Sequence, residues 1–356
     1  MKKIRFISYA FLSTSCLLIF PYSFGQSGNT VPDRFTLLTM PYNKRPVTLY
    51  KGQFQANAGY KLGIRTSSFD DSGSRLALKE NGSASVFHCY SYEIKYGFNK
   101  IIEAGAEINS IKHGIRSGSV AYFSGQNVIN INNLHETTGF DDLLLKIMIK
   151  APIPGQNFRA GIGTGISLPT ARHEPEQPSH TISDVIDDNN YTINYHFNNK
   201  NGNGVPLFYL SASIRMTSGK VTLGADASYR KPLKEGTSIR WSQSLVNRTF
   251  IYYKTDYNYL PDQSLNINAS IHYQASGWLD TYLAGNYFKS GMGWTDYYGV
   301  KYSNHRQSLF MIEPGFEIQI SPSLRIKEFA GFPFAGKNAD APMFILTSIS
   351  FNIFPW

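Results

Sequence analysis

Charged side chains occur at every second position of several segments, each time between apolar neighbours. Glu93 and Lys95, for example, flank Ile94. Successive side chains of a β-strand point to opposite faces, so these charges would share one face of a sheet. If that sheet closes into a barrel, they would either line a narrow hydrated path or form salt bridges that fill the interior. The residues that we expect to face such a lumen are Lys61, Arg65, Glu93, Lys95, Glu103, Glu107, Lys146, Arg159, Arg215, Asp226, Arg230, Glu313, Glu317, Arg325 and Lys327.

A second group of chemically capable residues lies between positions 170 and 205. Imidazoles and carboxylates are ligands for divalent metals. Their spacing here matches no compact ligand motif, so a solvated acidic loop is the favoured interpretation, and we predict neither a metal site nor a cofactor. The residues concerned are His173, Glu174, Glu176, His180, Asp184, Asp187, Asp188 and His196.

Ser270 and His272 stand two residues apart and would share one face of a strand. A serine activated by a histidine is the nucleophile of many hydrolases. A membrane-embedded hydrolase would also need an orienting asparagine or acid beside this pair on the lipid side. Both residues are expected to face the lumen instead, so we predict that the protein is not an enzyme.

Strands are the elements that must position these residues. Residues 53–65 alternate strictly between apolar and polar side chains over thirteen positions. A strand of an ordinary soluble domain has about five or six residues, whereas a tilted strand that crosses a membrane needs ~9–11. The same alternation recurs in twelve segments: 53–65, 90–98, 102–109, 143–150, 158–168, 208–216, 221–229, 265–273, 279–288, 310–320, 324–332 and 343–354.

The connections between these segments alternate between short and long. Outer-membrane barrels have short periplasmic turns and long extracellular loops. We therefore predict an all-β fold, a transmembrane antiparallel up-and-down β-barrel of about twelve strands with both termini in the periplasm. A soluble sandwich or propeller would not require strands of this length. The short connections are 99–100, 151–157, 217–220, 275–278 and 321–323; the others are 66–85, 112–138, 170–205, 231–261, 290–306 and 334–342.

The first residues resemble a secretory signal peptide. Three basic residues precede an apolar run from Phe6 to Phe20, and the small residues Ser23 and Gly25 suit cleavage before Gln26. The alternatives are an uncleaved membrane anchor and a lipoprotein signal ending at Cys16. We predict a signal peptide over 1–25, a periplasmic tail or lumen plug over 26–51 and the barrel over 52–356.

Composition excludes several other classes of protein. Cys89 is the single cysteine that remains after cleavage, so no internal disulfide can form. Removing the three basic residues of the signal peptide from a formal net charge of +9 leaves +6. The basic residues are scattered rather than clustered, so we predict no binding to nucleic acid.

Short motifs resemble a family of outer-membrane transporter-like barrels named for a phenol-degradation meta-pathway. The resemblance lies in the opening strand at 51–59, in Gly139–Leu143, and in the corner Leu168, Pro169 and Thr170, although Ala171 stands where the family has glycine. This resemblance implies a transporter or channel for small molecules, hydrophobic ones included, in the outer membrane of a Gram-negative bacterium. The alternative is a non-conducting surface or structural barrel whose long loops bind a partner or a glycan. Expected partners are outer-membrane lipid, the barrel assembly machinery and periplasmic chaperones during biogenesis, and a small-molecule solute.

Overall fold

The computed structural model describes residues 48–78, 85–99, 101–124, 127–151, 157–187, 190–246, 249–297, 299–321 and 323–353. The predicted signal peptide, residues 26–47 of the predicted tail or plug, and residues 152–156 of one predicted turn lie outside the described residues. Among the residues described, no helix is long and apolar enough to span a membrane.

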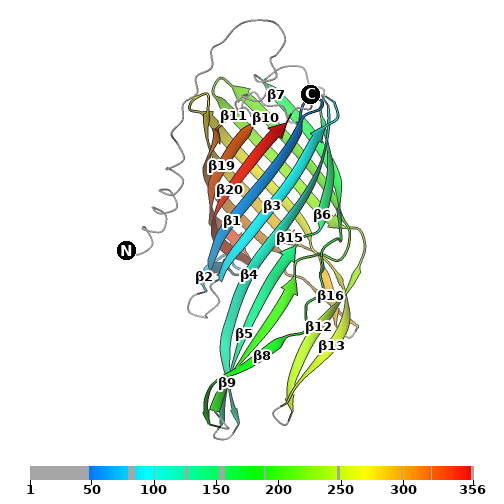
Figure 1. The fold of residues 1–356 in the computed structure, drawn as a ribbon, viewed down its shortest axis with the longest axis vertical. Helices are drawn as coiled ribbons and strands as arrows, with labels where there is room; N and C mark the ends of the chain where they lie inside the picture. The colour runs from blue at the N-terminus through cyan, green and yellow to red at the C-terminus, as the bar shows by residue number, and fades with distance from the viewer. Residues whose placement is uncertain are drawn as a thin grey trace, which may run out of the picture. The chain divides into compact units, whose positions relative to one another are not determined.

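Twelve strands pair in sequence order to close an antiparallel barrel (Figure 1). The first and last strands complete the circle, with Phe54 opposite Ile353 and Gly63 opposite Phe344. The predicted fold class and strand number are thereby confirmed. The barrel strands are β1 (Phe54–Phe69), β3 (Ser85–Gly97), β4 (Ile102–Ser124), β6 (Leu143–Lys150), β7 (Phe158–Leu168), β10 (Leu207–Ser218), β11 (Val221–Pro232), β14 (Gln263–Gln274), β15 (Leu279–Gly291), β18 (Gln307–Gln319), β19 (Leu324–Lys337) and β20 (Ala339–Ile353).

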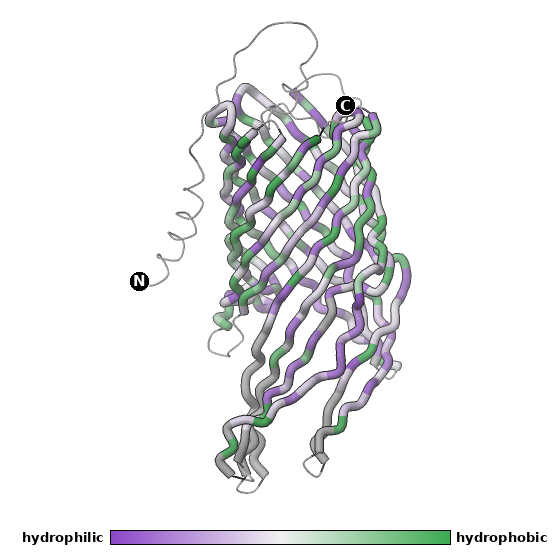
Figure 2. Tube along the Cα trace, in the orientation of Figure 1, coloured by the Kyte–Doolittle hydropathy of each residue, from purple (hydrophilic) through white to green (hydrophobic). Residues whose placement is uncertain are grey.

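Alternating side chains give the barrel wall an apolar outer face and a polar inner face. On β6, Leu145, Ile147 and Ile149 are 40%, 47% and 50% exposed, whereas Lys146 between the first two is only 20% exposed. Figure 2 shows hydrophobic and hydrophilic residues alternating along the barrel strands. Exposed apolar side chains on the outside and enclosed polar ones inside are the inverse of a water-soluble protein and suit a wall surrounded by lipid.

The short turns at one end of the barrel are held by side chains of their own residues. The side-chain oxygen Oδ1 of Asn99 accepts hydrogen bonds from the backbone N–H groups of Ile101 and Ile102, both at 2.8 Å. Ser276 and Ser321 likewise accept, through their hydroxyl oxygens, from the first residue of the following strand. Asparagine and serine satisfy turn backbone in this way, which is why the chain can reverse within a few residues there.

Several segments predicted to be polar connections form strands beyond the barrel rim. β4 continues to Ser124 instead of ending near residue 109, and β5 pairs with it in the antiparallel sense and with β9 in the parallel sense (Figure 1). The prediction that these segments are simple loops is therefore incomplete. The additional strands are β2 (Arg75–Ala77), β5 (Asn127–Phe140), β8 (Ser179–Asp187), β9 (Asn190–Lys200) and a separate four-stranded sheet of β12 (Gly236–Val246), β13 (Thr249–Leu260), β16 (Trp294–Tyr297) and β17 (Val300–Ser303).

Candidate solute pathway in the barrel interior

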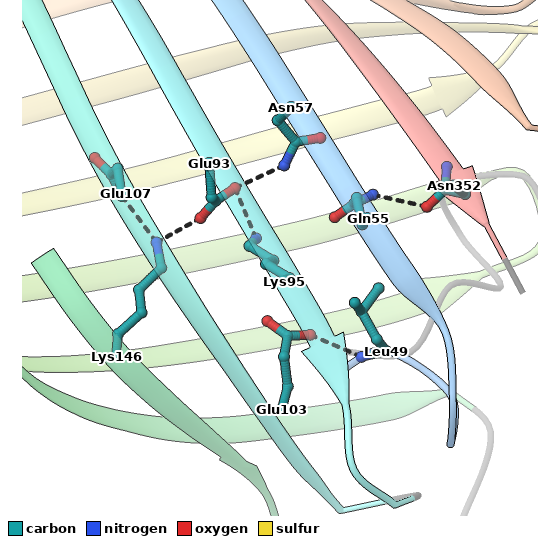
Figure 3. Close-up of polar contacts among 9 residues, drawn as sticks. All are labelled: Leu49, Gln55, Asn57, Glu93, Lys95, Glu103, Glu107, Lys146 and Asn352. Atoms are coloured by element: carbon teal, nitrogen blue, oxygen red, sulfur yellow. Dashed lines mark hydrogen bonds and ion pairs between the residues drawn. The ribbon is translucent and has the colours of Figure 1, made fainter. Parts of the chain in front are cut away.

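A charged cluster lies on the inner face of β3, β4 and β6 (Figure 3). The ammonium nitrogen of Lys146 lies 2.5 Å from Glu93 Oε1 and 2.9 Å from Glu107 Oε2. Glu93 also pairs with Lys95 at 3.1 Å and accepts a hydrogen bond from the Asn57 amide at 2.6 Å. Two carboxylates and two ammonium groups give this cluster, which we call the Lys146 cluster, no net charge.

Strand register explains why these residues meet. Glu93 stands directly opposite Glu107 in the β3–β4 pair. Like charges in that position repel each other. Lys146 stands opposite Gly105, and the glycine leaves its side chain room to reach both carboxylates. The cluster therefore neutralises a repulsion that the register itself creates.

A second group of predicted residues lies on β18 and β19. Lys327 Nζ sits 4.6 Å from the ring centroid of Tyr282 and 5.2 Å from that of Phe329. Arg325 and Glu317 pair at 3.9 Å, and both side chains are 13% exposed. Cations over aromatic faces gain electrostatic attraction, so this part of the wall combines charge with rings.

The other predicted residues are distributed over the inner wall and make separate contacts. Lys61 lies 4.5 Å from the Phe344 ring, Arg65 pairs with Asp340 at 2.7 Å, and Arg159 donates to Thr217 at 2.9 Å. Asp226 accepts from Ser213 at 2.6 Å, Arg230 lies 5.9 Å from the Tyr209 ring, Glu313 is buried, and Arg215 is half-buried on β10. The fifteen predicted positions thus form one cluster, one cation–aromatic group and several isolated contacts rather than a single site.

The residues just before β1 lie against the inner wall at the end of the barrel that carries the short turns. Thr48 is 2% exposed, and the backbone N–H of Leu49 donates to Glu103 Oε2 at 2.7 Å (Figure 3). The backbone of Gly97 pairs with that of Gly52 and Gln53, at 2.7 and 2.9 Å. A side chain at position 97 would collide with the Tyr50 carbonyl, since a Cβ there would lie 2.1 Å from its oxygen.

Neutral amides complete this end of the wall, and the sequence analysis missed them because it considered charged residues alone. Asn352 Oδ1 accepts from the Gln53 amide at 3.1 Å and from the Gln55 amide at 3.0 Å. These two bonds join β20 to the start of β1, where the barrel closes. The same alternation that revealed the charged residues also marks these positions as inward-facing.

The Ser270–His272 pair faces the barrel interior. His272 Nε2 lies 3.2 Å from Ser270 Oγ, and the buried ring stacks on Tyr282 with centroids 5.0 Å apart. This position is the lumen-facing one expected from the sequence.

The histidines of the 170–205 segment contact three different partners. His173 lies 3.1 Å from the Thr237 carbonyl oxygen, His180 lies 2.8 Å from the Tyr252 hydroxyl, and His196 lies 3.0 Å from Glu136. Within the ranges described, no three metal-ligating side chains come together.

Asp142 organises the chain at the long-loop end of the barrel. Its buried carboxylate accepts from the backbone N–H of Ala171 at 3.2 Å and of Asn203 at 2.8 Å. Tyr259 donates to the Asn203 carbonyl at 2.5 Å, and burial, aided by the charge of Asp142, raises the pKa of Tyr259 to about 12. One carboxylate thus anchors both ends of the 170–205 connection at the rim.

Known structures share this architecture at low sequence identity. No family model matches the chain, and no curated protein matches it in sequence. An outer-membrane channel from Pseudomonas putida F1 matches 88% of this chain and 99% of its own, with 12% identity and a TM-score of 0.57. The chain has the fold of an outer-membrane β-barrel.

Weaker matches extend to barrels with other described roles. The toluene transporter TbuX of Ralstonia pickettii shows 11% identity over 85% of this chain and 90% of its own, with a TM-score of 0.43. The translocator domain of the autotransporter NalP from Neisseria meningitidis shows 8% identity over 85% and 90%, with a TM-score of 0.44. At these sequence identities, the similarity to this chain is a similarity of fold alone.

Proposed function

We propose that the protein is a channel through which small molecules, hydrophobic ones included, cross the outer membrane. The observation that carries this proposal is the inner face of β7, where Gly161, Gly163 and Gly165 occupy three successive inward positions. Barrels that conduct nothing are filled by inward side chains. At these three positions the wall contributes no side chain to the interior, although Ser211 and the β6 backbone lie close beside Gly163 and Gly165.

Two features support a regulated or narrow path rather than an open pore. The Lys146 cluster holds its charges against one wall, with side chains 17–24% exposed. The segment from Thr48 to Gln53 lies inside the wall at the short-turn end. We propose that residues 26–51 act as a lumen plug rather than as a loose periplasmic tail.

The solute class draws support from named relatives. The Ralstonia pickettii barrel is described as a toluene transporter, and another match is described as a monoaromatic hydrocarbon channel. The proposed role is not enzymatic, because the Ser270–His272 pair faces the lumen and not the lipid. Biogenesis would require periplasmic chaperones and the barrel assembly machinery, as for other chains of this architecture.

Purified protein in planar bilayers and in liposomes tests the channel proposal. We expect discrete current steps and swelling in small neutral solutes. A protein that is folded by heat-modifiable gel mobility but gives neither current nor flux would contradict it.

A second candidate is a surface barrel that binds a partner, and the edge strand β17 favours it. All four residues of β17 are exposed, with Val300 at 52% and Tyr302 at 56%. An exposed edge strand offers unpaired backbone groups to another chain. Deleting residues 294–303 separates partner binding from solute flux. If β17 binds a partner, the deletion should abolish surface binding and leave the flux unchanged.

A further inference from the structure

A small cavity lies on the inner wall halfway along β10, β11 and β14. Its volume is about 180 Å³. Its polar lining consists of Ser211, Ser213, Asp226, Ser228, Asn266 and Asn268. We call this cavity the Ser/Asn pocket.

Register arranges the polar residues of the Ser/Asn pocket in two rows that cross three strands. Ser213, Asp226 and Asn268 stand opposite one another in the first row. Ser211, Ser228 and Asn266 form the second row, two residues nearer the long-loop end. The rows place hydroxyls, amides and one carboxylate side by side on the inner wall.

Glycines on the neighbouring strand β7 lie beside the Ser/Asn pocket and leave room for its residues. Gly161 stands opposite Ser213 and Gly163 stands opposite Ser211. A Cβ at position 163 would lie 2.3 Å from the Ser211 hydroxyl oxygen, so a larger residue there would displace it. Asn266 is exposed even though it points into the barrel, as expected for a side chain beside empty space.

Most of these polar groups have no partner in the protein. Asp226 accepts one hydrogen bond, from the Ser213 hydroxyl. Among the residues that the structure describes, the side chains of Ser211, Ser228, Asn266 and Asn268 make no hydrogen bond. Asn266 is exposed to the lumen, and Ser228 and Asn268 are half-buried, so their polar groups are accessible from the lumen. A ligand with hydrogen-bonding groups of its own can take the place of water on them.

Size and chemistry define the class of that ligand. An apolar cavity of about 150 Å³ accepts benzene, so the Ser/Asn pocket has room for one six-membered ring. Serine hydroxyls donate and accept, asparagine amides do both, and the carboxylate of Asp226 accepts. A molecule with several hydroxyl groups matches this mixture of donors and acceptors. An anion would be repelled by the carboxylate of Asp226. Met148 and Tyr209 add an apolar edge against which a ring can pack.

We propose that the Ser/Asn pocket binds a neutral polyol the size of one ring. This inference deepens the proposed channel function and rests on it for its purpose, because a weak site midway along the lumen would select the solutes that pass. Binding itself can be measured whether or not the barrel conducts.

Calorimetry on the detergent-solubilised full chain tests the pocket, with myo-inositol as the probe and cyclohexanol as a ring of the same size with one hydroxyl. We expect saturable binding of myo-inositol and none of cyclohexanol. Asn268→Leu and Asn266→Leu should each weaken the binding by about tenfold, because an apolar side chain leaves ligand hydroxyls unpaired. Ser350→Leu, which adds similar bulk at an inward position on β20, should leave it unchanged.

Bilayer recordings of the same proteins distinguish failure of the pocket from failure of the channel. Conduction without saturable myo-inositol binding, or binding that Asn268→Leu leaves unaltered, overturns the pocket. Saturable binding that Asn268→Leu abolishes, in a barrel that never conducts, supports the pocket and overturns the channel. Each variant is first shown to fold by its heat-modifiable gel mobility.

Discussion

The ammonium nitrogen of Lys146 lies 2.5 Å from a carboxylate oxygen of Glu93, although the two residues are far apart in the sequence. The same ammonium bridges Glu107 at 2.9 Å. One cation on β6 therefore holds together two carboxylates that face each other on β3 and β4.

Replacing Lys146 with methionine should destabilise the barrel and change its ion preference. Two facing carboxylates would lose their shared cation. Because these groups also contact water in the lumen, we expect a loss of about 1–2 kcal/mol rather than the larger cost of a fully buried pair. Urea unfolding in liposomes measures the stability, and the reversal potential in a KCl gradient should shift toward cation selectivity.

Lys150→Met is the matched control for that variant, since it removes the same charge from the same face of β6. Adding Glu93→Gln to Lys146→Met should recover part of the stability. Equal effects of Lys146→Met and Lys150→Met would show that the bridge contributes nothing specific.

An arginine on the lipid-facing side of the wall should cost far more than one on the inner side. Ile349 is 45% exposed on the outer face of β20, and Ser350 is its inward neighbour. Ile349→Arg should lower the unfolding free energy by about 2–4 kcal/mol, as a cation in the hydrocarbon layer does. Ser350→Arg should cost much less, because its charge enters the hydrated lumen. Similar losses for both variants, measured by urea titration in liposomes, would argue against the assigned faces.

A methyl group at Gly97 should displace the segment before β1. Its Cβ would lie 2.1 Å from the Tyr50 carbonyl oxygen, which forces the backbone at residues 48–53 to move. If residues 26–51 plug the lumen, Gly97→Ala should raise single-channel conductance and the rate of liposome swelling. Gly277→Ala is the control, since nothing lies within 4 Å of the added atom. Unchanged conductance in a folded Gly97→Ala protein would remove the plug.

Asp142→Ala should loosen the 170–205 connection at the rim without unfolding the barrel. Its carboxylate supplies the acceptor for the backbone N–H groups of Ala171 and Asn203. Losing a buried acceptor leaves two donors unsatisfied, at a local cost of about 1–3 kcal/mol. Limited proteolysis on whole cells should then cut within 171–204 faster than in the native protein. Asp141→Ala is the control, since the Asp141 side chain bonds to the backbone N–H of its next neighbour; equally fast cleavage there would contradict the anchoring role.

The barrel strands can be predicted from the sequence because one face of each strand meets lipid and the other meets the polar interior. On β6, the lipid side carries Leu145, Ile147 and Ile149, and Lys146 and Lys150 mark the inner side, although Leu144 and Met148 also lie there. Beyond the rim the alternation is present on β9, where Tyr191, Ile193, Tyr195 and Phe197 alternate with polar residues. Ile193 and Tyr195 are buried, at 0% and 3% exposed. The strand was missed because the whole of 170–205 was assigned to a connection on its polar composition.

The sequence predicts which residues face the barrel interior better than it predicts which of them contact each other. Period two gives the face on which Glu93 lies, but its pairing with Lys146 depends on the register of two strand pairs. The Ser/Asn pocket was missed for a different reason. Serine, asparagine and glycine carry no charge, so positions such as Asn268 and Gly163 attract no attention until the cavity beside them is known.

Single-channel recording of the purified full-length protein in planar bilayers tests directly whether the barrel is a channel. We expect small, discrete current steps, together with swelling of liposomes in small neutral solutes. Folded protein that produces neither steps nor swelling, in the native form and in Gly97→Ala alike, would contradict a channel.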